Sequence, residues 1–598
     1  MDTNVFTGDQ QVHSDLQVRS RSRSLAADAL SRAEPDSNVE FVEQSYELSE
    51  IHSHSSSPTP IEPFAPEENA SRYYSVDLPR SRASSHSSHF QKGESKVESK
   101  EYFHVLTRNW NLIFACFGVS FTGFFFGYDT GTVGGITNMQ PWLKRFGHYN
   151  ASSGEYEMST AIIGIIVSAF HIGCITGGFT IARLADHLGR RAPIAIACFV
   201  YMIGISVQLS AGKGKWYQYM IGRMITGLTV GANAVLSPML LSEIAPPTIR
   251  GVIVNFYQIN VTHGILVGYI VDYATKGIYT DNRMWRLPLI GGYIFSLIII
   301  PVLTRVPESP RYLIQRGRFE DAKKCVAKLK GFNLDFNSGS TLSATDAAYM
   351  NEVVEEVEFL KAASHYQLRE QRNASFWQLF SKKYLKRTIS GMCVMAFQQM
   401  SGIDYFLYYG TKLFKSVGIE DSYVTSIILG AINAGMTYVS IFVADNLGRK
   451  KGLFWGSVSC FTCLFIFSTI GVVMVDHQEN PNAKLSGTIM IVFTCLFIAV
   501  FCCSWSAIAS VLVSEIFSLE IKSKAMAFSQ AFNWGSNFFI ALCTPIITAR
   551  IGYAFGYVFT GFMFVAIIFV YFFIPETKGM TLEEIDDYYE GKHEITEV

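Results

Sequence analysis

Long apolar stretches recur along the chain between Asn111 and Ile574, and they constrain its fold more than any other feature. A helix of about twenty apolar residues crosses the roughly 30 Å of hydrocarbon in a bilayer. Because lipid offers no hydrogen-bond partners to the backbone, spanning stretches of this length are helical. The sequence therefore predicts an all-α membrane protein with twelve transmembrane helices, near 111–135, 159–181, 192–210, 217–240, 251–273, 287–305, 390–414, 423–444, 452–474, 487–512, 524–548 and 551–574.

Charge and cysteine content exclude several classes of protein. The formal net charge of −1 shows no basic excess, so nucleic acid is not an expected partner. All of the 11 cysteines except Cys325 fall in the apolar stretches, which indicates packing rather than a disulfide framework. Cys460 and Cys463 have the spacing of a redox or metal pair, but no histidine or second cysteine pair lies nearby. We therefore expect no metal and no cofactor.

Residues 1–100 differ in composition from the rest of the chain. They are rich in serine and poor in aliphatic residues, which predicts a disordered cytosolic N-terminal tail. No signal sequence opens the chain, so the first apolar stretch is expected to act as the signal. Serines between arginines, as in "RSRSRS", make regulatory kinases or ubiquitin ligases candidate partners of the tail; an unmodified solvated tail is the alternative.

Basic residues in the connecting segments predict the orientation in the membrane. Loops 182–191, 445–451 and 515–524 and the segment 306–389 are basic, which places them and both termini in the cytoplasm. The multi-pass chain is expected in the plasma membrane. Asn150, in the triplet "NAS", then lies in the first external loop and is a candidate for glycosylation.

Three motifs occur twice, in the same order. "DHLGRR" (186–191), "SEIAPPTIRG" (242–251) and "PESPR" (307–311) return as "DNLGRK" (445–450), "SEIFSLEIKS" (514–523) and "PETKG" (575–579). This duplication predicts two pseudo-symmetric halves of six helices, 105–305 and 390–574. A cytosolic central loop with short helices, 306–389, joins them, and a short cytosolic tail, 575–598, follows. A substrate site is expected near the midplane between such halves.

The same motifs carry a resemblance. Together with "GYDTG" (127–131), "GRMITGL" (222–228) and "QQMSGIDYFLYYGT" (398–411), they resemble the sugar-porter family of the major facilitator superfamily, and within it the fungal hexose transporters. The resemblance implies a hexose transporter for glucose-like sugars that works by alternating access, either as a facilitator or as a proton symporter, and not an enzyme. The alternative is a transporter-like sugar sensor. Such sensors usually carry a long C-terminal extension, whereas here about twenty residues follow "PETKG".

The resemblance also implies a sugar pocket. Sugar hydroxyls both donate and accept hydrogen bonds, so amides and aromatic faces suit them better than one strong charge. Taken singly, each amide also fits an ordinary hydrogen bond between helices. The monosaccharide-binding residues implied by the family motifs are Gln258, Gln398, Gln399, Asn433, Asn533 and Trp534.

Asp404 departs from the family pattern, which has asparagine at this position. It lies five residues after Gln399, about 140° around a straight helix, so the two share a face only if the helix breaks. Ser401-Gly402 supplies a place for the break, and Asp404 is then predicted to face the sugar. The alternative is a buried acid held by the hydroxyl of Tyr405 or Tyr408.

Other charged residues are candidates for coupling and gating. Proton-coupled family members have an acid and an arginine where Asp129 and Arg223 stand, so these two residues are the candidates for proton coupling. His171 and His263 also lie in apolar stretches, and we expect them to be packing or hydrogen-bonded residues. The repeated motifs predict charge pairs that lock the cytosolic faces of the two halves together, with ordinary solvated helix caps as the alternative. The gate candidates are Asp186, Arg190 and Arg191, Glu243 with Arg250, Glu308 with Arg311, and Arg449 and Glu515 with Lys522.

Overall fold

The computed structural model describes most of the chain after residue 109. The described residues are 110–151, 154–245, 250–332, 344–372, 375–415, 422–475, 483–518, 520–580 and 582–589. The tail predicted for residues 1–100 lies outside them. So does Ser152 of the candidate glycosylation triplet, although Asn150 itself is described in β1.

Long helices built from the apolar stretches form a first group, called here the N-terminal group. Within it α6 packs on α8, α4 on α9, and α7 on α8 and α10. The members are α3 (Trp110–Ser120), α4 (Thr122–Ile136), α6 (Thr160–Leu188), α7 (Arg191–Leu209), α8 (Trp216–Ile244), α9 (Arg250–Ile278) and α10 (Arg283–Arg305). A short helix, α5 (Gln140–Phe146), and the antiparallel pair β1 (His148–Asn150) and β2 (Glu155–Glu157) connect α4 to α6.

A second set of helices forms the C-terminal group. Two of its members contain a π-helical turn, at η5 and η6, where the regular hydrogen bonding shifts by one residue. The members are α14 (Leu385–Met400), α15 (Ile403–Lys415), α16 (Ser422–Leu447), α17 (Arg449–Ile470), η5 (Gly471–Val475), α18 (Ala483–Phe501), η6 (Cys502–Ser506), α19 (Ala507–Ile516), α20 (Lys522–Ile551), η7 (Gly552–Phe555) and α21 (Gly556–Phe573).

Glycines at positive φ stand where three of the long helices end. Gly402 has φ +91° and separates α14 from α15, so the predicted break is confirmed. Gly189 and Gly448 have φ +92° and +78° and follow α6 and α16 in the two copies of the repeated motif. Only glycine adopts such angles without strain, which explains why both repeats turn at this residue.

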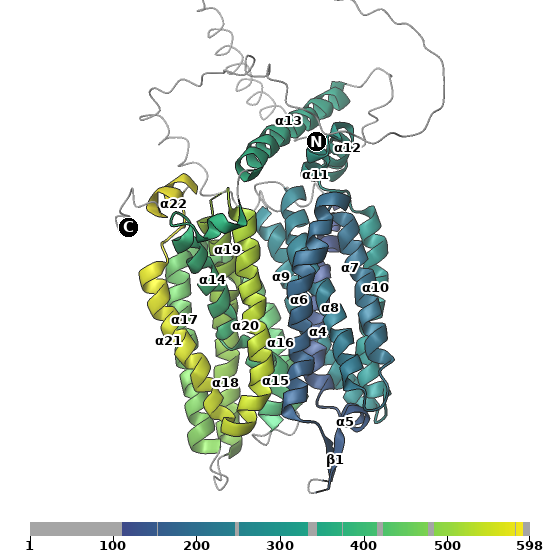
Figure 1. Ribbon diagram of the computed structural model, residues 1–598, viewed down its shortest axis with the longest axis vertical. Coiled ribbons are helices and arrows are strands. Elements are labelled where there is room, and N and C mark those ends of the chain that lie inside the picture. Colours follow the sequence, from purple (N-terminus) through teal and green to yellow (C-terminus); the bar gives the residue numbers. More distant parts are fainter. Residues whose placement is uncertain are drawn as a thin grey trace, which may run out of the picture. The chain divides into compact units, whose positions relative to one another are not determined.

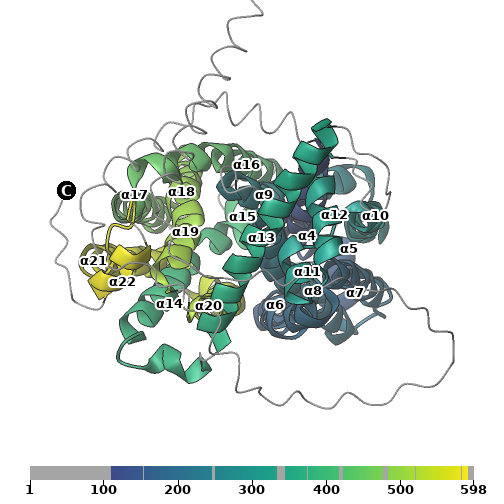
Figure 2. The ribbon, with the colours of Figure 1, turned by 90° about the horizontal axis from the view of Figure 1, so that it is seen from above.

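The two groups contact each other along three pairs of helices. α6 lies beside α20, α9 beside α16, and α4 beside α15. Figures 1 and 2 show the N-terminal group in blue and teal on one side and the C-terminal group in green and yellow on the other. Sequence-distant helices therefore meet at the boundary between the groups, where a substrate site was predicted.

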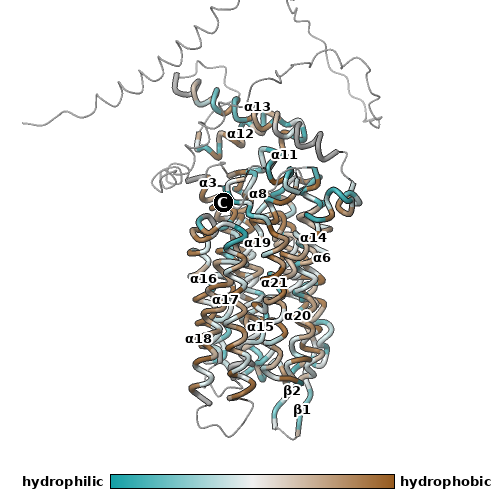
Figure 3. Tube along the Cα trace, turned by 90° about the vertical axis from the view of Figure 1, so that its left-hand side faces the viewer, coloured by the Kyte–Doolittle hydropathy of each residue, from teal (hydrophilic) through white to brown (hydrophobic). Residues whose placement is uncertain are grey.

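The exposed surface of the long helices is apolar. Within the described residues, nine segments are long and apolar enough to cross a bilayer, and the longest, Lys522–Phe573, contains both α20 and α21. Phe199, Phe442 and Phe572 are 53%, 71% and 70% exposed. A surface of this kind needs a hydrocarbon environment. Figure 3 shows apolar residues along the long helices and hydrophilic residues in β1 and β2.

Further helices lie at the end of the bundle opposite β1 (Figure 1). They are α11 (Pro310–Gln315), α12 (Phe319–Leu329), α13 (Ala344–Arg372), η4 (Phe376–Phe380) and α22 (Leu582–Tyr589). Four of them are short, but α13 has 29 residues and is longer than the short helices predicted for residues 306–389. The Tyr312 hydroxyl donates to the His187 carbonyl oxygen at 2.8 Å, which ties α11 to α6. The Cys325 thiol donates to the Glu308 carbonyl oxygen at 2.9 Å, and burial raises the pKa of this thiol to about 12, so it remains a neutral donor.

Candidate functional site

Three predicted amides meet where α14 approaches α20. Gln399 Nε2 donates to Asn533 Oδ1 at 3.0 Å, and Asn533 Nδ2 donates to Gln398 Oε1 at 2.7 Å. Gln398 Nε2 also donates to the Trp505 carbonyl oxygen at 3.0 Å. Asn533 is buried, while the two glutamines are half-buried. The three residues, called here the amide cluster, thus have donors and acceptors that can exchange partners with hydroxyl groups.

Trp534 turns toward the N-terminal group from the next position on α20. Its ring lies 5.3 Å from the ring of Phe126 in an edge-to-face arrangement and 6.2 Å from the ring of His171. Trp534 is 5% exposed. α20 therefore presents an amide to its own group and an aromatic ring across the boundary, a combination that suits a ligand with both hydroxyl and C–H faces.

Two other predicted pocket residues are not linked to the amide cluster. Asn433 on α16 is buried, and its Oδ1 accepts from the Cys502 thiol in η6 at 3.0 Å. Gln258 on α9 is half-buried, and its side-chain amide makes no hydrogen bond in the described part of the chain; only its carbonyl oxygen accepts, from the Thr262 hydroxyl at 3.4 Å. The structure thus brings Gln398, Gln399 and Asn533 together and leaves Gln258 and Asn433 on separate helices.

Asp404 lies in the first turn of α15, just after the break. It is 6% exposed, and its Oδ2 has no hydrogen-bond partner among the described residues. The Tyr408 hydroxyl lies 3.3 Å from His171 Nε2, and the Tyr405 hydroxyl is buried without a partner among the same residues. Neither tyrosine makes the hydrogen bond that the buried-acid alternative requires.

Asp129 and Arg223 form an ion pair between α4 and α8. They are 4% and 2% exposed, and the guanidinium also lies 4.8 Å from the centre of the Phe170 ring. A buried ion pair is held together because either partner alone would be an uncompensated charge. The acid and the arginine that the resemblance singled out are therefore in direct contact.

Hydrogen bonds join the two groups from the middle of the bundle toward the end that carries β1. The Tyr438 hydroxyl lies 3.3 Å from His263 Nε2, and the Tyr269 hydroxyl donates to the Leu407 carbonyl oxygen at 2.7 Å. The Tyr423 hydroxyl donates to the Gly135 carbonyl oxygen at 3.0 Å. With the His171–Tyr408 contact, these bonds confirm that both histidines are hydrogen-bonded residues. They also close the two groups against each other at this end.

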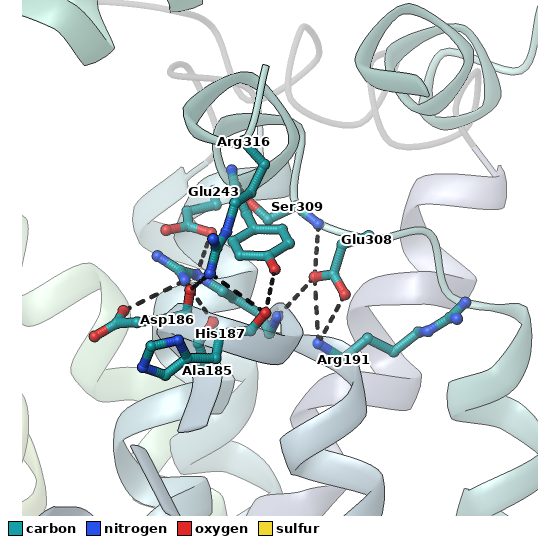
Figure 4. A network of polar contacts seen from close by, with 10 residues as sticks. Ala185, Asp186, His187, Arg191, Glu243, Glu308, Ser309 and Arg316 are labelled. Carbon is teal, nitrogen blue, oxygen red and sulfur yellow. Dashed lines mark hydrogen bonds and ion pairs between the residues drawn. The ribbon is translucent and has the colours of Figure 1, made fainter. Parts of the chain in front are cut away.

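Charged residues form a network at the opposite end of the N-terminal group (Figure 4). Arg190 lies 3.4 Å from a Glu243 carboxylate oxygen and 3.6 Å from one of Asp186. Glu308 Oε1 accepts from the backbone N–H of Arg190 at 2.8 Å and from that of Arg191 at 3.3 Å. The network fastens α6, α7, α8 and the start of α11 to one another.

The C-terminal group repeats this arrangement. Arg449 lies 2.8 Å from a Glu515 carboxylate oxygen, and Glu576 Oε1 accepts from the Arg449 backbone N–H at 2.7 Å. Glu576 takes the place of Glu308 in the second repeat. It was not among the predicted gate residues, although the repetition of "PES" as "PET" could have identified it.

The prediction that these charges lock the two halves to each other needs correction. Each ion pair in the two networks joins helices of one group, because the charges at a helix end turn toward the neighbouring helix of the same repeat. Three expected pairs are also not ion-paired in the described ranges: Glu243 with Arg250, Glu308 with Arg311, and Glu515 with Lys522.

Asp272 is a buried acid that the sequence analysis missed. It lies on α9, is fully buried, and neither carboxylate oxygen has a hydrogen-bond partner within the described residues. A side chain on Gly135 of α4 would collide with its Oδ2, so the acid fits against bare backbone. An aspartate within an apolar stretch is a functional candidate in its own right, and the reasoning applied to Asp404 would have identified it.

Comparison with known proteins relates this arrangement to a family. A family model described as "Sugar (and other) transporter" matches residues 115–589. Hexose transporter HXT10 of Saccharomyces cerevisiae is 40% identical over 490 residues, which cover 81% of this chain and 86% of that protein. Hexose transporter 2 of Kluyveromyces lactis is 42% identical over 481 residues, which cover 79% and 82%.

Solved structures share the fold. One is the major facilitator superfamily proton:xylose symporter XylE bound to 6-bromo-6-deoxy-D-glucose, with a TM-score of 0.63 and 25% identity over 81% of this chain and 100% of that one. Another is an inward-open conformation of the xylose transporter XylE from E. coli, with a TM-score of 0.62 and 25% identity over 80% and 99%. The fold thus defines a multi-pass transporter of the major facilitator class. The chain belongs to the sugar transporter family, as its motifs predicted.

Proposed function

We propose that the protein carries a hexose across the plasma membrane by alternating access, with the amide cluster and Trp534 at the sugar site. The observation that carries this proposal is the meeting of Gln398, Gln399 and Asn533 beside the boundary of the two groups. Relatives named as hexose transporters support the substrate class. Gln258, Asn433 and Asp404 complete the pocket when a sugar replaces the hydrogen bonds within the cluster.

The helices support a proposed membrane arrangement with twelve spans. Nine described segments qualify as spans, and Lys522–Phe573 counts as two because it contains both α20 and α21. With α9 and the α14–α15 pair, the number of proposed transmembrane helices is twelve. We propose the same domain boundaries that the sequence predicts: 1–100, 105–305, 306–389, 390–574 and 575–598. Both termini and α11–α13 lie in the cytoplasm, while β1 and the glycosylation candidate Asn150 lie outside.

The charge networks brace each half rather than join the halves. Arg190 with Glu243 and Glu308, and Arg449 with Glu515, make each group move as a rigid body at its cytosolic end. The hydrogen bonds between the groups at the outer end break when that end opens. This division of roles suits the rocking of two repeats around a midplane site, because rocking needs stiff halves and a weak contact between them.

Uptake of labelled glucose tests the proposal. In a cell without hexose carriers of its own, we expect the protein to restore uptake and Asn533→Ala to reduce it strongly, because Asn533 links both glutamines. Gln140→Ala is the matched control, because that amide bonds Glu155 on the surface, and it should transport like the parent. Binding of glucose without uptake by the parent would indicate the sensor instead.

Asp129 distinguishes a proton symporter from a facilitator. If protonation of Asp129 releases Arg223 and couples a proton to rocking, uptake should alkalinise a weakly buffered medium and collapse with an uncoupler. The solved proton:xylose symporter of similar fold supports proton coupling. Asp129→Asn combined with Arg223→Gln removes the titrating acid without leaving an unpaired buried charge, and it should then abolish accumulation and spare exchange of sugar for sugar. Parent uptake that never exceeds equilibrium would identify a facilitator.

A further inference from the structure

A cavity of about 390 Å³ lies at the cytosolic end of the N-terminal group, beside the start of α7 and against α11 and α12. Four basic residues line it: Arg191 from α7, Arg318, and Lys324 and Lys328 from α12. In Figure 4 the side chain of Arg191 extends away from Asp186 and Glu243 of the charge network. Cations from separate elements thus converge on one hollow of the surface.

The acidic residues of this cavity are occupied by other partners. Glu308 accepts hydrogen bonds from the backbone N–H groups of Arg190, Arg191 and Ser309. Asp321 forms an ion pair with Arg318 at 2.8 Å. The two carboxylates therefore leave the charges of Arg191, Lys324 and Lys328 without an acidic partner in the described part of the chain.

The polar contacts of the remaining cations do not neutralise them. Arg191 Nη1 donates to the Val306 carbonyl oxygen at 3.1 Å, and Lys328 Nζ donates to that of Arg305 at 3.2 Å. These neutral acceptors at the end of α10 fix the position of the two side chains and leave their positive charge in place. Lys324 is exposed and makes no hydrogen bond or ion pair with the described residues. Because four basic residues face two carboxylates, the cavity has an excess of positive charge.

An apolar surface leads away from the cavity. α7 begins at Arg191 and exposes Phe199 and Ile203 at 53% and 56%, while α10 ends beside Arg305 and exposes Leu297 and Ile298 at 61% and 56%. The two helices pack against each other, and each carries apolar side chains that are exposed to hydrocarbon. A ligand with a negatively charged headgroup and apolar tails matches a basic cavity that adjoins helices with exposed apolar side chains.

We propose that the cavity binds the phosphate-bearing headgroup of an anionic phospholipid, with its acyl chains lying along α7 and α10. The proposal rests on the membrane orientation given above and is independent of the identity of the sugar. Basic residues at the cytosolic surface attract anionic lipids in any membrane protein, at about 1 kcal/mol each. This cavity differs from a general basic surface because its cations converge on one hollow, and because its two carboxylates already have other hydrogen-bond or ion-pair partners.

Counting bound lipid by native mass spectrometry tests this site. The purified full chain is titrated with phosphatidylserine against a background of phosphatidylcholine. Lys324→Gln/Lys328→Gln should bind the anionic lipid about tenfold more weakly or worse, since two lysines near the surface are removed. Lys382→Gln/Lys386→Gln removes two exposed lysines at the same end of the C-terminal group and should bind like the parent. Equal losses in both double variants would overturn the proposal.

A second arm separates a lipid from a free anion. Inorganic phosphate, added at the concentration at which phosphatidylserine is half-bound, should leave lipid binding unchanged, because it cannot contact α7 and α10. Displacement of the lipid at that concentration would show a free-anion site and contradict the proposal. If the double variant is poorly folded, Lys324→Glu alone applies the same test, because its side chain is exposed and has no structural partner in the described residues.

Discussion

An Arg223→Leu variant is expected to lose most of its folded population, because Asp129 would remain as a buried carboxylate without its counter-charge. The two residues are 2% and 4% exposed and in direct contact. Removing one partner of a buried ion pair costs about 3–5 kcal/mol of the free energy of unfolding. Size-exclusion profiles and thermal midpoints of the purified variant measure the loss.

Two controls separate this effect from a general need for charge. Asp129→Asn with Arg223→Gln replaces the pair by neutral amides and should recover much of the folded protein. Arg283→Leu breaks an aspartate–arginine pair with Asp281 whose side chains are 67% and 54% exposed. It should cost less than about 1 kcal/mol, because water screens exposed pairs. An Arg223→Leu variant as stable as Arg283→Leu would contradict the assignment of a tight buried pair.

Features encoded locally could be predicted from the sequence. Apolar length predicted the long helices, and the Ser401-Gly402 pair predicted the break before Asp404, because a glycine at positive φ interrupts hydrogen bonding wherever it stands. The structure also turns at Gly189 and Gly448, the glycines that the two copies of the repeated motif share. In each case the cause lies within a few residues of the effect.

Features that depend on which helices become neighbours could not be predicted in this way. The sequence predicts that Glu243 pairs with Arg250 of the same motif, but the structure pairs it with Arg190 at the start of α7. The amides of the predicted pocket also have different partners. Asn533 donates a hydrogen bond to Gln398, whereas Asn433 accepts one from the Cys502 thiol. Residue type and spacing indicate what a side chain can bind, and helix packing decides which partner it meets.

Packing also explains how a weak boundary and stiff halves coexist in one chain. Between the groups, the described hydrogen bonds are single contacts from tyrosine hydroxyls, such as Tyr269 to Leu407 and Tyr423 to Gly135. Each contributes about 1 kcal/mol, so a few can break together at moderate cost. Within each half, Glu308 and Glu576 each accept hydrogen bonds from several backbone N–H groups at once, and the proposed rocking leaves these contacts intact.

Replacement of Asp404, the acid in the proposed pocket, should strongly change the affinity for sugar. The residue is buried after the helix break, its Oδ2 lacks a partner among the described residues, and the hydroxyls of Tyr405 and Tyr408 are not bonded to it. A buried polar group left without a partner is costly, and a sugar hydroxyl that donates to Oδ2 removes this cost. Asp404→Ala should therefore raise the KM for glucose about tenfold or more without lowering the amount of protein at the membrane.

Asp404→Asn gives the more specific result. The amide keeps the shape of the carboxylate, accepts one hydrogen bond and donates two, whereas an ionised aspartate only accepts. The amide is also uncharged, so no unpaired charge is buried among the neighbouring side chains. In a low dielectric, removal of this charge has a larger effect than the change in hydrogen-bonding capacity. We therefore expect Asp404→Asn to lower the KM for glucose and to alter the ranking of competing sugars. Asp281→Asn, at an exposed acid, controls for loss of charge alone and should leave the KM unchanged. If both Asp404 variants transport with the parent KM, Asp404 does not contact the sugar, and its role is confined to the start of α15.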